Sequence, residues 1–249
     1  MFNQIYNCDC LEGMKKIPDG SVDFILSDLP FQMTDCHWDK KIPFEPMWKE
    51  FYRVAKKNAA MALFANGKFL IELAASNLKD YRYKIVWLKN LATGFLNAKK
   101  MPLKCHEDVL IFYRQLPTYN PQFTQGKPYI HHGNQYRSEN YRDGIENWRT
   151  SSDGRRFPRD IVKGCQPQVN DTAFHPTQKP VELLEYLIKT YTNEGEVVLD
   201  ATIGSGSTAV AAINTNRQFI GFELDEKYFE IAQKRISEAQ AKREQILLE

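Results

Sequence analysis

The chain lacks any long hydrophobic segment. None of its apolar runs approaches the roughly 20 residues that a membrane-spanning helix needs. The first residues, MFNQIYNCDC, also lack a basic region followed by an apolar core, so we expect no export signal. With 43% hydrophobic and 26% charged residues, the 249-residue chain has the composition of a globular protein. We therefore expect a cytoplasmic protein with no membrane partner.

Cysteine is scarce and scattered. The five cysteines include no C-x-x-C pair; they are Cys8, Cys10, Cys36, Cys105 and Cys165. An odd, scattered set indicates reduced thiols rather than a disulfide framework. The five histidines show no metal-ligand spacing, so we expect no metal site. Internal repeats and low-complexity segments are also absent, which argues against repeat architectures.

The net charge of +2 hides an uneven distribution. Between Tyr81 and Cys165 there are 15 Lys and Arg against 7 Asp and Glu, whereas the rest of the chain has 18 against 24. Aromatic residues are interleaved with this basic segment: Tyr119, Phe123, Tyr129, Tyr136, Tyr141, Trp148 and Phe157. Such a segment is either solvated surface or a nucleic-acid-binding face, and charge alone does not choose between them.

Hydrophobic periodicity predicts strands and helices that alternate. The predicted strands are Val22–Leu26, Ala60–Phe64, Tyr83–Leu88, Val109–Tyr113, Glu196–Leu199 and Gln218–Phe222, and the predicted helices are Phe44–Ala55, Phe69–Leu78, Pro180–Tyr191, one from Ser207, and Glu226–Gln245. This order predicts an α/β fold with a doubly wound, mostly parallel sheet and helices on both faces. From Arg114 to Phe174 prolines, glycines and polar residues predict an irregular insertion. The last helix is expected to be a surface helix packed on the sheet.

A glycine turn near the C-terminus indicates a nucleotide-like ligand. In VVLDATIGSGSTAVAA, residues Gly204, Gly206 and Ala209 fit G-x-G-x-x-A between a strand and a helix. Glu223 follows 19 residues after Gly204, at the end of the next strand, where a carboxylate can bind both ribose hydroxyls. Together they predict an adenosine-containing cofactor, either a nicotinamide dinucleotide or S-adenosylmethionine. The alternative is a tight turn beside a surface acid.

A second strand-end motif favours methyl transfer. In VDFILSDLPF, Asp28 follows a buried strand, and Pro30 biases Leu29 to an extended conformation that holds its carbonyl in one direction. The carboxylate and this carbonyl can accept hydrogen bonds from the two N–H groups of an exocyclic amine, and Phe31 offers a stacking face for a flipped base. A nicotinamide-dependent dehydrogenase would leave this motif without a role.

The sequence resembles the amino-group DNA methyltransferases of the permuted β type, in which the catalytic motif precedes the cofactor motif. The resemblance covers most of the chain except about residues 114–174. The segments that carry it are NCDCLEGMKKIPDGSVDFILSDLPF, HEDVLIFYR, HPTQKPVELLEYLIKTYTNEGEVVLDATIGSGSTAVAA and FIGFELDEKYFEIAQKRI. It implies a Rossmann-like methyltransferase fold. The implied divisions are a catalytic half at 1–113, a target-recognition insertion at 114–174, and a half that binds S-adenosyl-L-methionine at 175–249.

The resemblance also implies the roles of individual residues. The implied catalytic motif is Asp28, Leu29, Pro30 and Phe31. The implied cofactor residues are Asp9 and Cys10 at the adenine, Thr177 and Lys179 near the methionine end, Asp200, Thr202, Gly204 and Gly206 along the turn, and Glu223 at the ribose. Two departures from the family pattern are Leu29, where proline is usual, and residues 201–203, which replace a Pro-Phe-x run and remove an aromatic wall.

The substrate expected from this resemblance is double-stranded DNA, methylated at the N6 amine of adenine in a short site after base flipping. An acid at position 28 favours adenine, since the corresponding motif for the N4 amine of cytosine more often begins with serine. RNA or protein glutamine is a further alternative, usually marked by asparagine. A non-catalytic DNA-binding module would explain the basic insertion but neither strand-end motif. A homodimer and a cognate restriction endonuclease are partners that the sequence leaves open.

Overall fold

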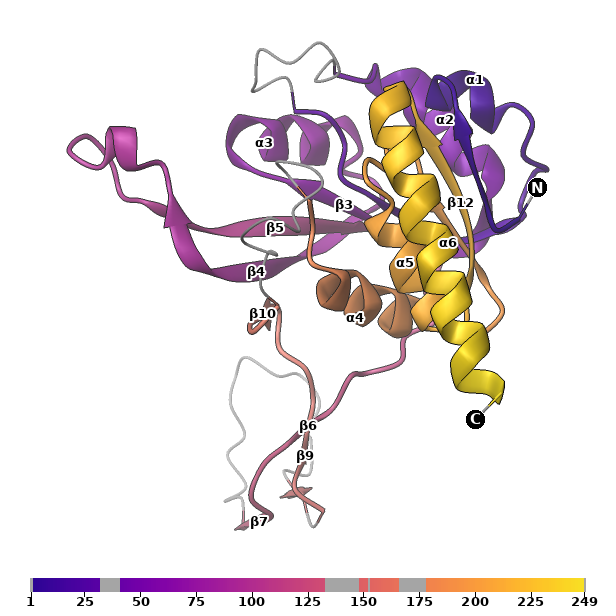
Figure 1. Ribbon diagram of the computed structural model, residues 1–249. Coiled ribbons are helices and arrows are strands. Elements are labelled where there is room, and N and C mark those ends of the chain that lie inside the picture. The colour runs from indigo at the N-terminus through magenta and orange to yellow at the C-terminus, as the bar shows by residue number, and fades with distance from the viewer. Residues whose placement is uncertain (1, 32–40, 133–147, 152, 166–177, 249) are drawn as a thin grey trace. The chain divides into compact units, whose positions relative to one another are not determined.

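The apolar runs of the sequence form the strands of one large sheet (Figure 1). Across the sheet the order is β1 (Gln4–Asn7), β12 (Gln218–Glu223), β11 (Val197–Asp200), β2 (Val22–Ser27), β3 (Ala55–Ala65), β5 (Lys104–Phe112), β4 (Tyr81–Thr93) and β10 (Ile161–Val162). The computed structural model describes residues 2–31, 41–132, 148–151, 153–165 and 178–248. Within them the chain divides into a main unit, Met1–Asn120 with Asp160–Glu249, and a small unit, Pro121–Arg159.

The sheet is mixed but mostly parallel. The pairs from β1 through β12, β11 and β2 to β3 are parallel, and so is β10 with β4, whereas β5 pairs antiparallel with both β3 and β4. Chain connections run outward in opposite directions from β11 and β2, so the strand order reverses between these two neighbours. In open α/β sheets, ligands bind outside the carboxyl ends of the strands at such a point.

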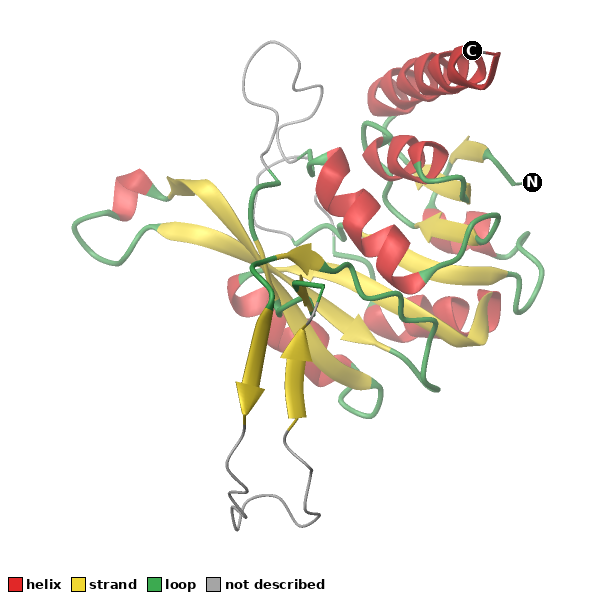
Figure 2. Cartoon of the chain, turned by 90° about the horizontal axis from the view of Figure 1, so that it is seen from below, coloured by secondary structure: helices red, strands yellow, loops and turns green. Residues whose placement is uncertain are grey.

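Helices cover both faces of the sheet, as predicted (Figure 2). On one face lie α1 (Cys10–Met14), α2 (Phe44–Val54) and α3 (Gly67–Ser76); on the other lie α4 (Val181–Tyr191), α5 (Ser207–Asn214) and α6 (Glu226–Leu248). Strand β2 serves both, because Ile25 belongs to the first core and its neighbours Phe24 and Leu26 to the second. Burial on both faces explains why this strand is a continuous apolar run. No helix in the described ranges is long and apolar enough to cross a membrane.

The predicted elements agree with the structure except at edges and ends. The sequence did not predict β1, a four-residue strand paired with β12, or the 3-10 turn η1 (Phe95–Asn97). The strands predicted for β4 and β5 are also shorter than the observed ones, because the observed ladder continues as far as Thr93 opposite Lys104. The parts beyond the predicted strands are largely exposed, so they lack the apolar alternation from which strands are predicted.

Only the middle of the predicted insertion forms a separate unit, and the insertion contains short strands. At its start, Arg114 donates hydrogen bonds to the carbonyls of Ala55 and Lys56, and Asn120 bonds to α4 and to the residues after it. At its end, β10 pairs with β4. Both flanks therefore belong to the main unit, and the separate unit spans Pro121–Arg159, inside the predicted insertion of 114–174.

The small unit contains two short antiparallel ladders. One joins β6 (Thr124–Gln125) to β9 (Arg155–Arg156), and the other joins β7 (Tyr129–His132) to β8 (Trp148–Ser151). Phe123 and Phe157 pack with ring centroids 4.9 Å apart, and the Arg156 guanidinium lies 4.4 Å from the centre of the Tyr129 ring. These strands are too short and polar for periodicity to reveal.

The core beneath α4 should control stability. Leu187 is fully buried between this helix and the sheet, so Leu187→Ala should lower the free energy of unfolding by about 2–5 kcal/mol through lost burial and the cavity that remains. The matched control is Ile71→Ala, because Ile71 is an exposed residue of α3 and its truncation should change stability by less than about 0.5 kcal/mol. Urea denaturation of both variants measures the difference, and equal effects would contradict the assignment of this core.

Candidate active site

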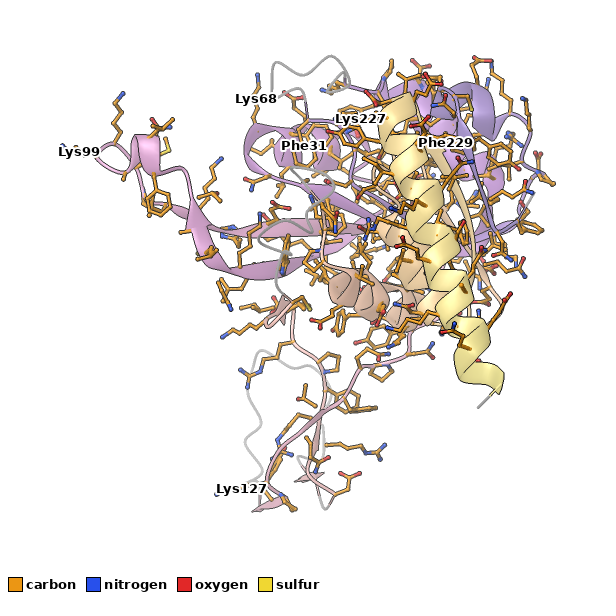
Figure 3. All side chains as sticks on the ribbon, viewed as in Figure 1. Phe31, Lys68, Lys99, Lys127, Lys227 and Phe229 are labelled. Carbon is orange, nitrogen blue, oxygen red and sulfur yellow. The ribbon has the colours of Figure 1, made fainter. Side chains whose placement is uncertain are left out.

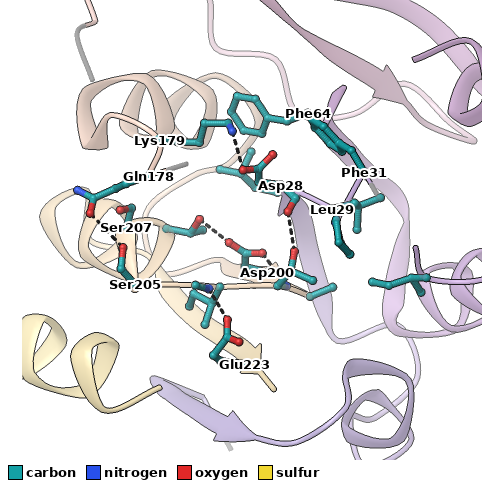
Figure 4. A pocket seen from close by; sticks show the side chains of 18 of the residues that line it. Asp28, Leu29, Phe31, Phe64, Gln178, Lys179, Asp200, Ser205, Ser207 and Glu223 are labelled. Carbon is teal, nitrogen blue, oxygen red and sulfur yellow. Dashed lines mark hydrogen bonds and ion pairs between the residues drawn. The ribbon is translucent and has the colours of Figure 1, made fainter. Parts of the chain in front are cut away.

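A cavity of about 920 Å³ opens at the carboxyl ends of β1, β2, β11 and β12. Residues 28–31 after β2, 200–205 after β11, Glu223 at the end of β12 and residues 8–11 after β1 all line it. Figure 4 shows Asp28, Leu29 and Phe31 on one side of this pocket and Asp200 and Glu223 on the other. The two strand-end motifs found in the sequence therefore meet in one site, at the reversal of strand order.

A buried lysine holds the carboxylate of Asp28. Lys179 Nζ lies 2.5 Å from Asp28 Oδ2 (Figure 4). It also lies 3.3 Å from Glu107 Oε2. Lys89 in turn pairs with Glu107 Oε1. The Lys179 side chain is only 9% exposed, and its ammonium lies 5.0 Å from the centre of the Phe64 ring. Because an unpaired buried charge is costly, the two carboxylates fix the position of this lysine.

The cluster sets the charge of each group. Burial lowers the pKa of Lys179, but the charges of Asp28 and Glu107 outweigh burial, so the pKa is raised and the lysine stays protonated. Burial raises the pKa of Glu107, yet Lys179 and Lys89 hold it below its usual range. For Asp28 burial prevails, and its pKa is raised although Lys179 opposes the shift. The same lysine therefore contacts two carboxylates whose pKa values are shifted in opposite directions.

The residues after β2 form a compact turn against the cofactor-side loop. Thr202 Oγ1 donates a hydrogen bond of 3.0 Å to the carbonyl oxygen of Asp28, which ties the ends of β2 and β11 together. The Leu29 side chain is buried in the first core. The ring of Phe31 stacks on Phe69, with centroids 4.7 Å apart. The turn is thus held by packing and by one hydrogen bond from the neighbouring strand end.

Glycine is needed for a different reason at each of the two glycine positions in the turn after β11. Gly204 has φ of +55°, and a Cβ added there would meet no atom within 4 Å, so its backbone borders open space in the cavity. Gly206 has φ of +84°, and a Cβ added there would lie 3.1 Å from Cα of Ala232 in α6. The first glycine leaves room for a ligand, and the second allows α6 to pack closely on the turn.

Asp200, the last residue of β11, holds the turn from within. Its Oδ1 accepts a hydrogen bond from the Thr202 N–H at 3.0 Å, and its Oδ2 accepts one from the Thr208 hydroxyl at 2.6 Å. Burial raises the pKa of Asp200 to about 7, although the hydrogen bonds from Thr208 and Thr202 oppose the shift. This side chain lines the cavity, and its two hydrogen bonds hold the turn in shape.

Glu223 is anchored at the end of β12. Its Oε2 accepts from the Gly204 N–H at 2.9 Å, and its Oε1 accepts from the Asp225 N–H at 2.8 Å. Burial raises its pKa, and these amide hydrogen bonds oppose the rise. A carboxylate offers about four acceptor positions, so its acceptor capacity is not exhausted by these two bonds.

The predicted adenine-side residues begin α1. Asp9 is its N-cap, and Asp9 Oδ1 accepts from the N–H groups of Leu11 and Glu12 at 2.9 and 3.1 Å. Asp9 and Cys10 both line the cavity. Burial, followed by the nearby charge of Asp9, raises the pKa of Cys10 to about 12, so this thiol stays protonated. Thr177 lies outside the described residues.

Arg235 links α6 to the glycine turn. Its guanidinium is buried and donates to the carbonyl oxygen of Ser205 at 2.6 Å, to Ser205 Oγ at 2.9 Å and to Ser207 Oγ at 3.1 Å. Ser205 Oγ also donates to Gln178 Oε1 at 3.1 Å. The turn is therefore fixed from the helix side as well as from the sheet.

Sequence reasoning missed Glu107, Lys89 and Arg235. Glu107 stands on β5, within the HEDVLIF run, and an acid entering a buried apolar strand is a signal that could have marked it. Lys179 is predicted to lie near the methionine end of the cofactor, and in this structure its ammonium pairs with the carboxylate of Asp28. No spacing rule connects Lys179 with Asp28, because 151 residues separate them.

Comparison with known proteins identifies the family. A model for DNA methylases, named for N6 and N4 methyltransferases, matches residues 22–234. The type II methyltransferase M.BglII of Bacillus subtilis is 27% identical over 253 residues, covering 92% of this chain and 68% of that protein. The DNA adenine methyltransferase YhdJ of Escherichia coli is 27% identical over 250 residues, covering 94% and 83%.

A solved structure shares the fold. The M1.HpyAVI–SAM complex superposes with a TM-score of 0.63 at 24% identity, covering 94% of this chain and 98% of that chain. The matched DNA methylase family uses S-adenosyl-L-methionine. The family match includes both strand-end motifs and helices α2 to α5. The chain therefore belongs to the N6/N4 DNA methylase family and is a DNA methyltransferase.

Proposed function

We propose that this methyltransferase modifies the N6 amine of adenine in double-stranded DNA, after the base has left the duplex. The observation that supports it most directly is the single cavity lined by Asp28 at the end of β2 and Glu223 at the end of β12. A volume of about 920 Å³ is large enough for a nucleoside cofactor and an extrahelical base.

The cofactor half of the cavity fits S-adenosyl-L-methionine. Glu223 would accept hydrogen bonds from the ribose hydroxyls with its remaining lone pairs, the open backbone at Gly204 would lie against the ligand, and Asp9 and Cys10 would border the adenine. When bound, this cofactor supplies an electrophilic methyl group. The chain contributes a turn that is held by hydrogen bonds from Asp200, Glu223 and Arg235.

The catalytic half would act on the amine by orientation. Asp28 receives one hydrogen bond from Lys179, which leaves acceptor positions on its carboxylate for an amine N–H. The Leu29 carbonyl would accept the other N–H, in the direction imposed by Pro30. As the nitrogen gains positive charge, these two acceptors stabilise it electrostatically.

A flipped base also needs an apolar surface. Phe31 lines the cavity and is supported from behind by Phe69, which would keep its ring in place when a base stacks on it. Phe64 and Trp87 line the cavity as well. The base-binding side is therefore well supplied with aromatic rings, as base flipping requires.

Adenine is proposed over cytosine because the motif begins with an acid, Asp28, and because a relative of 27% identity, YhdJ, is a DNA adenine methyltransferase. The alternative within the family is the N4 amine of cytosine, since the family name covers both amines. The two products differ chemically, so a single nucleoside analysis distinguishes them.

The segment 114–174, and within it the small unit, is proposed to recognise the target sequence. It offers six arginines as guanine readers: Arg137, Arg142, Arg149, Arg155, Arg156 and Arg159. Arg155 pairs with Asp153, and Arg156 donates to the Gly154 carbonyl at 3.0 Å, so both serve the unit's own structure. Arg159 is exposed, and Arg137 and Arg142 lie outside the described residues.

The first test concerns the catalytic carboxylate. Wild-type protein should produce N6-methyladenine in DNA, and Asp28→Ala should abolish transfer while the affinity for S-adenosylmethionine changes by no more than about a few fold, because Asp28 acts mostly in the transition state. Mass spectrometry of digested DNA and calorimetry measure the two quantities. N4-methylcytosine as the product would overturn the choice of base, and near wild-type transfer by the variant would overturn the role of Asp28.

The second test concerns the ribose site. Glu223→Ala should weaken S-adenosylmethionine binding by about 2–4 kcal/mol, since two charge-assisted hydrogen bonds would be lost. Glu223→Gln is the matched control: it keeps the shape of the side chain and should bind with intermediate affinity. Isothermal titration measures both, with a thermal melt to check folding. Unchanged affinity in the alanine variant would rule out the ribose role.

The third test concerns sequence recognition. Alanine at Arg137, Arg142, Arg149 or Arg159 should act in one of two ways: loss of a phosphate contact lowers the salt slope of DNA binding by about one unit at an unchanged site, and loss of a base contact relaxes the site at one position. Salt-dependent binding and long-read sequencing of methylated DNA measure these effects. Arg156→Ala is the control for a structural arginine. If none of the four changes either property, recognition lies elsewhere in the chain.

A further inference from the structure

Strands β4 and β5 form a hairpin that extends beyond the rest of the sheet (Figures 1 and 2). Its tip is a short turn containing η1, entered through Gly94 with φ of +93°. Backbone hydrogen bonds shape this turn, including Asn97 N–H to the Gly94 carbonyl at 2.9 Å and Met101 N–H to the Asn97 carbonyl at 3.0 Å. The tip is thus a preformed structure that does not depend on a hydrophobic core.

The apolar side chains of this tip are exposed. Leu96 is 100% exposed and Phe95 is 70% exposed, and both Leu91 and Met101 are exposed beside them. None of these four belongs to either core of the main unit. Apolar residues clustered on a projecting turn, with no role in the fold, mark an interaction surface.

The charge of the hairpin identifies the kind of partner. From Tyr81 to His106 there is no Asp or Glu, but there are six basic residues: Arg82, Lys84, Lys89, Lys99, Lys100 and Lys104. Lys99 projects from the tip (Figure 3). Arg82, Lys84 and Lys89 pair with Asp80, Asp108 and Glu107, whereas Lys99, Lys100 and Lys104 lie at or beside the tip, so the positive charge is concentrated there. A basic tip with exposed apolar side chains is complementary to a polyanion with stacked apolar interiors, which describes duplex DNA. A second copy of the same face would instead bring like charges together.

The part of the hairpin next to its tip reaches the cavity of the candidate active site. Leu91, Thr93 and Lys104 line the same cavity as Asp28. Thr93 pairs with Lys104 in the ladder, directly before the tip. DNA that delivers a base to this cavity would therefore pass beside the hairpin.

We propose that the tip of the β4–β5 hairpin binds duplex DNA next to the methylated base. Lys99 and Lys100 contact phosphates, and Phe95 and Leu96 insert between base pairs where the flipped nucleotide leaves the stack. Phenylalanine and leucine are among the side chains that proteins use as such wedges. This role rests on the proposed base flipping, because the wedge compensates for the stacking that the duplex loses.

The test compares a matched duplex, carrying the methylated site found by sequencing, with the same duplex mismatched at the target base pair. Phe95→Ala with Leu96→Ala should lower kcat/KM on the matched duplex by at least about tenfold, and much less on the mismatched one, where flipping is already easier. Leu78→Ala is the control, because Leu78 is 69% exposed and precedes β4 at the other end of the hairpin. It should match wild type on both duplexes.

A separate measurement tests the phosphate contacts. Lys99→Ala with Lys100→Ala should lower the salt slope of DNA binding by about one unit per lysine.

In the comparison of the two duplexes, methyl groups are counted from labelled cofactor on any base, so an error in the choice of adenine leaves the result readable. Equal losses on both duplexes, or an unchanged rate, would overturn the wedge. A wild-type dimer that the Phe95/Leu96 variant converts to monomer would show that a second copy occupies the tip.

Discussion

Parallel pairing of β2, β11, β12 and β1 is the constraint on which the site depends. In a parallel ladder all carboxyl ends emerge at one edge, and the residues that follow each strand are brought together whatever their separation in the chain. Asp28 and Glu223 line one cavity for this reason alone. The covering helices bury both faces of the sheet, and this rigidity holds the turns at fixed distances from one another.

Within that frame, one buried ammonium organises the catalytic side. Lys179 enters from the segment before α4 and joins Asp28 on β2 to Glu107 on β5. Three segments from distant parts of the chain are thus joined through the ammonium group of Lys179. Since its two carboxylate partners keep the lysine protonated, the carboxylate of Asp28 has a cation beside it, which limits how far burial can raise the pKa of Asp28.

The sheet and its strand-end turns could be predicted from the sequence better than the cluster of charged residues around Lys179. Strand β2 and the glycine turn could be predicted because continuous apolar runs, a terminal acid and G-x-G spacing are local signals. The Lys179–Asp28–Glu107 cluster could not, because it forms only when β5 and the start of α4 flank β2 in the folded chain. The small unit was predicted as irregular for another reason: its strands of two to four residues are too short to show a period. Residues 114–120 look like loop in sequence, yet Arg114 and Asn120 attach them to the main unit.

Helix α6 illustrates how a surface element acquires a share in binding. From its sequence it is an ordinary amphipathic helix, but Arg235 crosses from it to three oxygens of Ser205 and Ser207 in the glycine turn. A ligand that favours the ordered turn must therefore also favour the docked helix, and a docked helix must raise affinity for the ligand by the same factor, because coupling free energies are reciprocal. The last helix of the chain is in this sense thermodynamically coupled to the glycine turn that lines the cavity.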